Sequence, residues 1–255
     1  MEKTVIAYYT GTGNTLALAK RFEGVKLVDI IKINEKTASL DDDISRLGIF
    51  FPVYMGGIPY PVREFIENTL KERDNSELKY VFSLLTCGSG GKGAEWMIDR
   101  ALQEIGIGLS YTLSIRYPDS YLPLIKKVPA LDKTKEILDK AEDLIQKAIT
   151  DIEKEEIKLP RKPMFGRMMI KMTSKTGPSS KDKKMSVGEN CIGCGLCASI
   201  CPSDNISIVD NKAVLGDKCL HCYACYNFCP NSAIKYQGRF SRYKPIVDIE
   251  ELKRR

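Results

Sequence analysis

The sequence is poor in histidine and in long apolar runs. His221 is the only histidine among 255 residues, which excludes histidine-rich zinc sites and facial-triad iron sites. No stretch approaches the roughly 18 to 20 uncharged apolar residues that a membrane helix needs. The N-terminus enters a strand pattern without the apolar region of a signal peptide. These absences predict a cytoplasmic protein without a membrane span.

Cysteine is almost absent from the first three quarters of the chain and dense in the last. Cys87 stands alone, whereas eight cysteines lie between Cys191 and Cys229. In a reducing compartment such clustering favours metal binding over disulfides. Because histidine is lacking, sulfur is the expected ligand. The length, with 43% apolar and 28% charged residues, is that of one or two globular domains.

Short apolar runs alternate with amphipathic segments over residues 1–157. Five runs read as strands, at residues 4–10, 25–31, 47–54, 80–87 and 109–117. The last three are apolar on both faces, as buried parallel strands are. The segments that begin near residues 14, 61, 93 and 131 have helical periodicity. The alternation predicts an α/β domain built on a five-stranded parallel sheet.

Residues 158–185 separate this pattern from the cysteine-rich part. They hold nine Lys or Arg and one Asp, a net charge of +8 within a chain total of +6, which leaves −2 for the rest. Interleaved Pro, Gly and Ser favour a solvated connector between domains, and binding of nucleic acid or an anionic membrane surface is the alternative. Docking of an acidic redox partner is compatible with a connector, because complementary charge speeds encounter.

The strongest pattern is C-x2-C-x2-C-x3-C-P, which occurs twice. The first copy consists of Cys191, Cys194, Cys197, Cys201 and Pro202, and the second of Cys219, Cys222, Cys225, Cys229 and Pro230. Two complete copies predict 4Fe-4S clusters. A zinc ribbon is the alternative, although it needs only four thiolates.

Residues 185–238 resemble the bacterial-type ferredoxin domain, a small α+β domain with two 4Fe-4S clusters. In that family the fourth cysteine of each motif ligates the other cluster. The resemblance implies one cluster held by Cys191, Cys194, Cys197 and Cys229, and a second held by Cys219, Cys222, Cys225 and Cys201. Each half is expected to run from cluster loop to short helix to strand. Gly193 and Gly195 are expected to let backbone N–H groups approach a cluster, and His221 is expected to be exposed and not a ligand.

A loop rich in Gly and Thr follows the first strand and opens a helix. It consists of Thr10, Gly11, Thr12, Gly13, Asn14 and Thr15. Backbone N–H groups and hydroxyls at a helix N-terminus bind phosphate, and a turn that only caps the helix is the alternative. The loop is neither a Walker A motif nor a dinucleotide fingerprint, because it lacks the Lys and its third glycine position holds Leu16.

This loop and the βα alternation resemble those of flavodoxins, which bind FMN. The resemblance implies a doubly wound sheet of order 2-1-3-4-5, with the flavin beyond the carboxyl ends of its strands. Two loops are then expected to flank the ring: Pro52, Val53, Tyr54, Met55, Gly56 and Gly57, and Thr86, Cys87, Gly88, Ser89, Gly90 and Gly91. Tyr54 is the expected stacking residue, and the peptide at Gly56 and Gly57 the group that turns toward the flavin N5. Cys87 is expected to be a small buried residue and not a nucleophile.

Polar and aromatic residues follow the fifth strand. Tyr117, Asp119 and Tyr121 form a simple turn in one interpretation. In the other, Tyr117 or Tyr121 donates a proton to a substrate over the flavin and Asp119 orients it.

As a whole, the chain resembles the flavodoxin-ferredoxin fusions of anaerobic bacteria and archaea. The expected parts are a flavodoxin-like domain at residues 1–157, the basic connector at residues 158–185 and a ferredoxin domain with a C-terminal extension at residues 186–255. The resemblance implies an electron relay between two 4Fe-4S clusters and FMN, with redox proteins as partners and a homodimer left open. An FMN-dependent reductase of a small molecule, supplied by its own ferredoxin domain, is the alternative.

Overall fold

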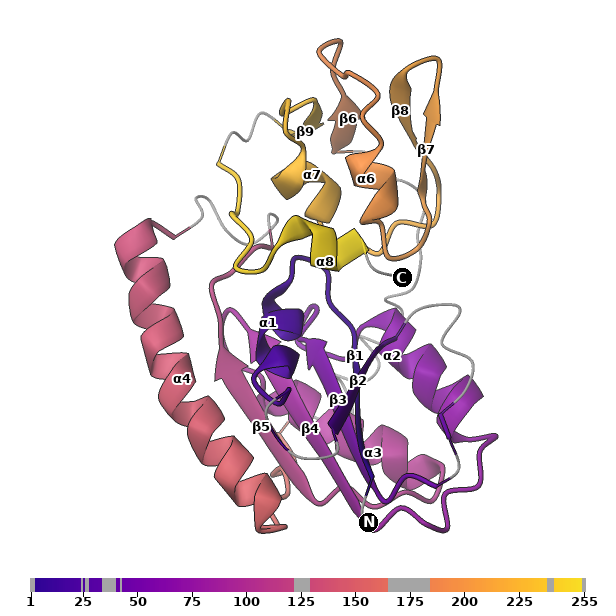
Figure 1. Ribbon diagram of the computed structural model, residues 1–255, viewed down its shortest axis with the longest axis vertical. Helices are drawn as coiled ribbons and strands as arrows, with labels where there is room; N and C mark the ends of the chain where they lie inside the picture. The colour runs from indigo at the N-terminus through magenta and orange to yellow at the C-terminus, as the bar shows by residue number, and fades with distance from the viewer. Residues whose placement is uncertain are drawn as a thin grey trace. The chain divides into compact units, whose positions relative to one another are not determined.

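The computed structural model describes residues 3–23, 25, 28–33, 40–41, 43–121, 129–164, 184–237 and 241–253. It divides the chain into two compact units, whose elements are labelled in Figure 1. The first unit consists of Met1–Thr10, Asn14–Pro118 and Ala130–Thr176, and the second of Gly11–Gly13, Asp119–Pro129 and Gly177–Arg255. Residues 165–183, most of the expected basic connector, lie outside the described residues.

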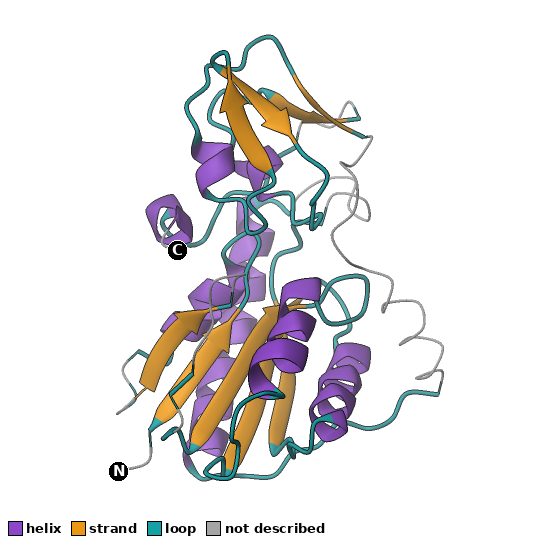
Figure 2. Cartoon of the chain, turned by 90° about the vertical axis from the view of Figure 1, so that its right-hand side faces the viewer, coloured by secondary structure: helices purple, strands orange, loops and turns teal. Residues whose placement is uncertain are grey.

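A five-stranded parallel sheet forms the centre of the first unit (Figure 2). Its strands are β1 (Thr4–Tyr8), β2 (Val28–Lys32), β3 (Arg46–Pro52), β4 (Tyr80–Cys87) and β5 (Tyr111–Arg116). They lie in the order β2-β1-β3-β4-β5, and all four neighbouring pairs are parallel. The predicted fold class is therefore confirmed. The strand order reverses between β1 and β3, and open α/β sheets bind their ligands outside the carboxyl ends at such a switch point.

Helices flank this sheet on both sides (Figure 2). They are α1 (Asn14–Lys20), α2 (Tyr60–Glu64) with its π-helical continuation η1 (Phe65–Leu70), α3 (Lys92–Glu104) and α4 (Leu131–Glu153). Because both faces are covered, β4 is buried along its entire length. The apolar face of α4 is buried at helical spacing, through Ile137, Ala141, Ile145, Ala148 and Ile152. None of the helices in the described part of the chain combines the length and apolar composition needed to span a bilayer.

The third strand ends two residues earlier than the sequence predicts. The apolar run continues to Tyr54, but β3 ends at Pro52. Tyr54 and Gly57 each donate their backbone N–H to the other's carbonyl oxygen, at 3.1 and 2.8 Å. These two hydrogen bonds close a tight turn, which takes the chain out of the sheet ladder.

Gly48 on β3 lies in a closely packed part of the core. A Cβ there would approach two ring carbons of Phe82 to 2.8 Å and Cγ1 of Ile6 to 3.0 Å. We expect Gly48→Ala to lower the free energy of unfolding by about 1–3 kcal/mol, because the buried ring must shift. Gly108→Ala is the matched control, since a Cβ there meets no heavy atom within 4 Å. Urea unfolding, followed by the fluorescence of Trp96, the single tryptophan, measures the free energy of unfolding of both variants. Equal stability of Gly48→Ala and Gly108→Ala would contradict this packing.

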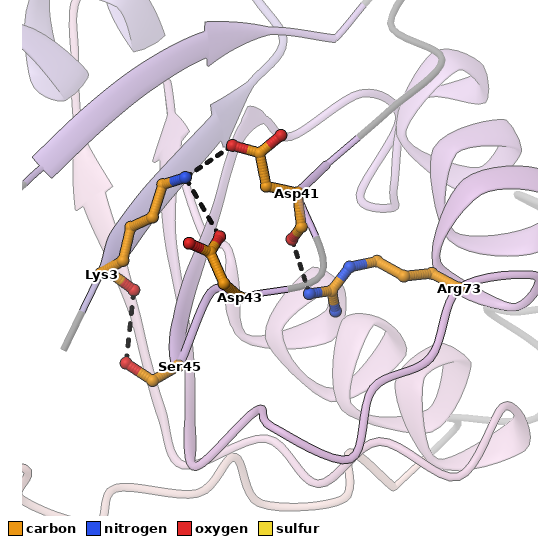
Figure 3. Close-up of polar contacts among 5 residues, drawn as sticks. All are labelled: Lys3, Asp41, Asp43, Ser45 and Arg73. Carbon is orange, nitrogen blue, oxygen red and sulfur yellow. Dashed lines mark hydrogen bonds and ion pairs between the residues drawn. The ribbon is translucent and has the colours of Figure 1, made fainter. Parts of the chain in front are cut away.

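An ion-pair cluster joins the start of β1 to the segment before β3 (Figure 3). The Lys3 ammonium lies 2.5 Å from Asp41 Oδ2 and 3.1 Å from Asp43 Oδ1. Arg73 donates to the Asp41 carbonyl oxygen at 2.8 Å, and the Ser45 hydroxyl donates to that of Lys3 at 3.4 Å. The hydrogen bond between Lys3 and Asp41 raises the pKa of the lysine and lowers that of the carboxyl. Because both carboxylates are exposed, the cluster contributes little to stability.

The described part of the second unit contains two small antiparallel sheets and three short helices. The sheets pair β6 (Met185–Val187) with β9 (Ile234–Tyr236) and β7 (Ile206–Val209) with β8 (Lys212–Leu215). The helices are α6 (Leu196–Ser199), α7 (Ala224–Phe228) and α8 (Ile249–Lys253). Asp210 and Asn211 close the β7–β8 hairpin with φ of 47° and 58°, as two-residue hairpin turns require. The order of loop, short helix and strand occurs in both halves, which confirms the predicted α+β domain.

Candidate functional site

Three loops follow the neighbouring strands β1, β3 and β4 at the carboxyl edge of the sheet: residues 10–15, 52–57 and 86–91. Thr86 connects them. Its Oγ1 lies 2.9 Å from Thr15 Oγ1, and its carbonyl oxygen accepts the Val53 N–H at 2.8 Å. The structure therefore brings together the three segments that the sequence assigns to the flavin.

The first of these loops offers neutral donors only. Thr10, Thr12 and Thr15 are buried, and the loop turns at Gly13 with φ of 93°. The Asn14 side chain donates to the Pro118 carbonyl oxygen at 3.0 Å. Hydroxyls and backbone N–H groups at the start of α1 suit a phosphate ester, which needs donors but not a cation.

The second loop contains a strained residue. Met55 and Gly56 have φ of 50° and 80°, between the two hydrogen bonds that join Tyr54 and Gly57. A left-handed backbone at a non-glycine residue costs about 1–2 kcal/mol, and such strain is concentrated at functional sites. The Tyr54 ring meets the buried Tyr9 ring edge-on at 6.0 Å. Pro52 and Val53 lead into this turn at the end of β3.

The third loop approaches β5 closely. A Cβ at Gly91 would lie 2.0 Å from Ser114 Oγ, so only glycine fits there. Gly90 has φ of 58°, and Gly88 and Ser89 connect it to Cys87. Cys87 is 9% exposed, and its Sγ lies 3.7 Å from the Ile115 carbonyl oxygen.

The residues predicted as a proton-donating group lie in two different environments. Tyr117 directly follows β5 and is buried, and burial raises the pKa of its hydroxyl. Asp119 Oδ1 accepts the N–H of Tyr121 at 2.9 Å, which is an Asx turn. Within the second unit, the Tyr121 ring packs edge-on against Tyr223 at 5.6 Å. Their catalytic role stays a prediction.

The eight clustered cysteines line two cavities in the second unit. One cavity is lined by Cys191, Cys194, Cys197 and Cys229, and the other by Cys201, Cys219, Cys222 and Cys225. Each cavity thus combines three cysteines of one motif with the fourth of the other. Among the described residues, no three His, Cys, Asp or Glu side chains gather at a spacing suited to a single metal ion; the thiols are distributed around the cavity walls.

Backbone N–H groups point at four of these sulfurs. Cys191 and Cys229 accept from Ala213 and Ala233 at 3.4 and 3.2 Å. Cys201 and Cys219 accept from Asn205 and His221, both at 3.4 Å. Such donors stabilise negative charge on sulfur, so the arrangement fits thiolates that hold iron.

The loops of the two cysteine motifs share a backbone conformation but differ in sequence. Gly193 and Gly195 have φ of 62° and 76°, and the corresponding positions of the second loop, His221 and Tyr223, have φ of 53° and 58°. The second loop therefore adopts a left-handed backbone without glycine. His221 is half-buried, and its ring lies 6.3 Å from that of Tyr223.

Burial makes several of these thiols hard to ionise. It raises the pKa of Cys197 to about 11 and that of Cys222 to about 12, and it also raises the pKa of Cys225. Neighbouring cysteines add to each shift, and they include Cys229 for Cys197 and Cys201 for Cys222. Thiolates at these positions would therefore need a bound cation to stabilise them, and the binding of that cation would release the thiol protons.

Residues 190–234, which include all eight clustered cysteines, match the family model of the 4Fe-4S dicluster domain. The chain fuses a flavodoxin-like domain with a ferredoxin-type domain. The ferredoxin-type match lies within the second unit, and the doubly wound sheet forms the flavodoxin-like domain. No curated protein sequence matches the chain significantly.

Three solved structures illustrate the similarity of the flavodoxin-like part. A flavoprotein in complex with FMN from Lactobacillus acidophilus is 17% identical, with 45% of this chain and 93% of that chain covered and a TM-score of 0.35. A flavodoxin from the domain Archaea is 18% identical, with 57% of this chain and 97% of that chain covered and a TM-score of 0.39. Rubredoxin oxygen:oxidoreductase from Desulfovibrio gigas is 16% identical, with 60% of this chain and 37% of that chain covered and a TM-score of 0.36. Because these TM-scores are low, the fold assignment rests on the strand order of this chain.

Proposed function

We propose that the chain is an iron-sulfur flavoprotein that relays electrons between two 4Fe-4S clusters and FMN. The observation that supports this most strongly is the sorting of eight thiols into two four-cysteine cavities. Each cavity takes its fourth cysteine from the other motif, which is the ligation pattern of two-cluster ferredoxins. The N–H groups that point at four of the sulfurs support thiolate ligands in both cavities.

We assign FMN to the carboxyl edge of the sheet. The loop at residues 10–15 has the hydroxyls and backbone donors for the phosphate, and the loops at residues 52–57 and 86–91 flank the ring. The contacts of Thr86 support this assignment, because its hydrogen bonds to Thr15 and Val53 hold the three loops together. The strained turn at Met55 supports a functional role for the middle loop.

The cofactors supply the redox chemistry, and the chain supplies ligands and their surroundings. Bound FMN exchanges one or two electrons and each cluster one, so the set converts between one-electron and two-electron chemistry. The cysteines hold iron, the N–H groups around them set the potentials, and Thr86 holds the flavin loops together. We expect redox proteins as partners and a reducing compartment such as the cytoplasm, because free thiols persist there.

Metal and flavin analysis of anaerobically purified protein tests this function. We expect about eight irons, a similar amount of sulfide and one FMN per chain, because each cluster holds about four irons. Zinc in place of iron would refute the cluster assignment, and protein that binds no FMN would refute the flavin assignment.

A further inference from the structure

The two halves of the ferredoxin-type domain place the same hydrogen bond on the last cysteine of each motif. The N–H group four residues further along the chain donates to its sulfur: Asn205 to Cys201 at 3.4 Å, and Ala233 to Cys229 at 3.2 Å. These backbone donors affect the two cluster sites alike. A difference between the surroundings of these two sulfurs must therefore come from other groups.

Ser203 introduces such a difference. Its Oγ lies 3.7 Å from Cys201 Sγ, the residue is only 5% exposed, and it lines the same cavity as Cys219, Cys222 and Cys225. The corresponding residue of the other half, two positions after Cys229, is Asn231. That side chain is exposed and donates to the Asn190 carbonyl oxygen instead.

The direction of the effect follows from which atom carries the proton. A cysteine that ligates iron has no proton, so the Ser203 hydroxyl must be the donor to Cys201 Sγ. Reduction adds negative charge to the cluster and its sulfurs, and a hydrogen bond to sulfur therefore stabilises the reduced form more than the oxidised form. Burial strengthens the hydrogen bond, because little water competes with it.

We propose that the Ser203 hydroxyl makes the cluster ligated by Cys201 the more easily reduced of the two. This inference rests on the proposed function, since it requires two clusters with crossed ligands. One electron then leaves the cluster held by Cys191, Cys194, Cys197 and Cys229, which is oxidised, and enters the cluster held by Cys201, Cys219, Cys222 and Cys225, which is reduced. Ser203 keeps its proton throughout. An external one-electron donor supplies the first electron.

Potentiometric titration of the full-length holoprotein, followed by electron paramagnetic resonance, tests this role. In Ser203→Ala we expect one midpoint potential to become more negative while the other is unchanged. The lost hydrogen bond is expected to change the reduction equilibrium of that cluster about tenfold, which is about 59 mV for one electron. The affected signal is the one that is missing in Cys222→Ala.

Two further variants separate this role from a general loss of packing. Ser203→Thr keeps a hydroxyl at this position, so it is expected to keep the wild-type midpoint potential of the cluster ligated by Cys201. Ser199→Ala is the matched control, because the Ser199 hydroxyl donates to the Leu196 carbonyl oxygen at 2.9 Å and not to a cluster sulfur. It is expected to leave both potentials unchanged.

The outcomes distinguish this inference from the proposed function. Wild-type protein with about four irons or fewer would refute the two-cluster function itself. If wild-type protein holds about eight irons but Ser203→Ala leaves both potentials unchanged, only the inference about Ser203 is refuted. It is likewise refuted if both potentials shift equally, or if Ser203→Thr behaves like Ser203→Ala.

Discussion

Replacing Cys201 with serine is expected to remove one of the two proposed clusters. That cluster takes its other three ligands from the second motif. Cys201 lines the cavity of Cys219, Cys222 and Cys225 and is not among the residues that line the cavity of its own motif. We therefore expect Cys201→Ser to lose about four of about eight irons. Iron and sulfide analysis of anaerobically purified protein measures the loss.

Double variants show which cluster is lost. With crossed ligands, Cys201→Ser combined with Cys222→Ser removes no more iron than either change alone, because both thiols hold the same cluster. Combined with Cys197→Ser, it removes nearly all the iron. Ligands taken from one motif only would reverse this pattern and contradict the account. Cys87→Ser is the control and is expected to keep all the iron, because Cys87 lies at the end of β4 in the other unit.

Thr15→Val is expected to weaken FMN binding by about tenfold to a hundredfold. Thr15 is fully buried at the start of α1, and its hydroxyl lies 2.9 Å from that of Thr86. In the proposed site this hydroxyl also serves the phosphate. A hydrogen bond to a charged group contributes about 1.5–3 kcal/mol, and each 1.4 kcal/mol is about a factor of ten in the dissociation constant. Quenching of FMN fluorescence on addition to flavin-free protein measures the change.

Riboflavin provides the control for this experiment, because it has the ring of FMN without the phosphate. We expect Thr15→Val to weaken riboflavin binding much less than FMN binding, so that the wild-type preference for FMN shrinks. Thr150→Val is the matched variant, since the Thr150 hydroxyl donates to Gln146 on α4, away from the loops. It is expected to keep the affinity for FMN. An equal loss of FMN and riboflavin affinity in Thr15→Val would contradict a phosphate site at this loop.

The sequence was most informative where one physical requirement acts on consecutive residues. Strands buried on both faces are apolar throughout, so β4 was predicted at residues 80–87 with its observed bounds. The charged helix α4 was recognisable from its apolar face, which recurs at helical spacing. Cysteine spacing predicted the two cluster loops, because three ligands of one cluster must lie close together along the chain.

Contacts between distant segments could not be derived in this way. The hydrogen bond between Thr15 and Thr86 joins residues 71 positions apart. The Ala213 N–H, which donates to Cys191 Sγ, belongs to a hairpin that follows later in the chain. The left-handed backbone of Tyr223 was also missed, because tyrosine rarely adopts it. Aligning the two motif copies places Tyr223 opposite Gly195, which is the signal that could have revealed it.

The π-helical turn η1 has no recognisable signal in the sequence. The pattern after Pro61 predicts a continuous α-helix, whereas the helix changes its winding from Phe65 to Leu70. The apolar residues Phe65, Ile66 and Leu70 are all buried in this turn. Tertiary packing thus decides the local winding of a segment whose helical character was predicted correctly.

Rapid mixing of the oxidised holoprotein with a one-electron reductant, followed by visible absorbance, tests the relay most directly. The account predicts that the clusters bleach first and that the flavin then bleaches as the clusters are reoxidised. In a Cys197→Ser, Cys201→Ser double variant, which lacks both clusters, the same reductant is expected to reduce the flavin much more slowly. A flavin that stays oxidised beside fully reduced clusters, or that is reduced equally fast without them, would contradict the relay.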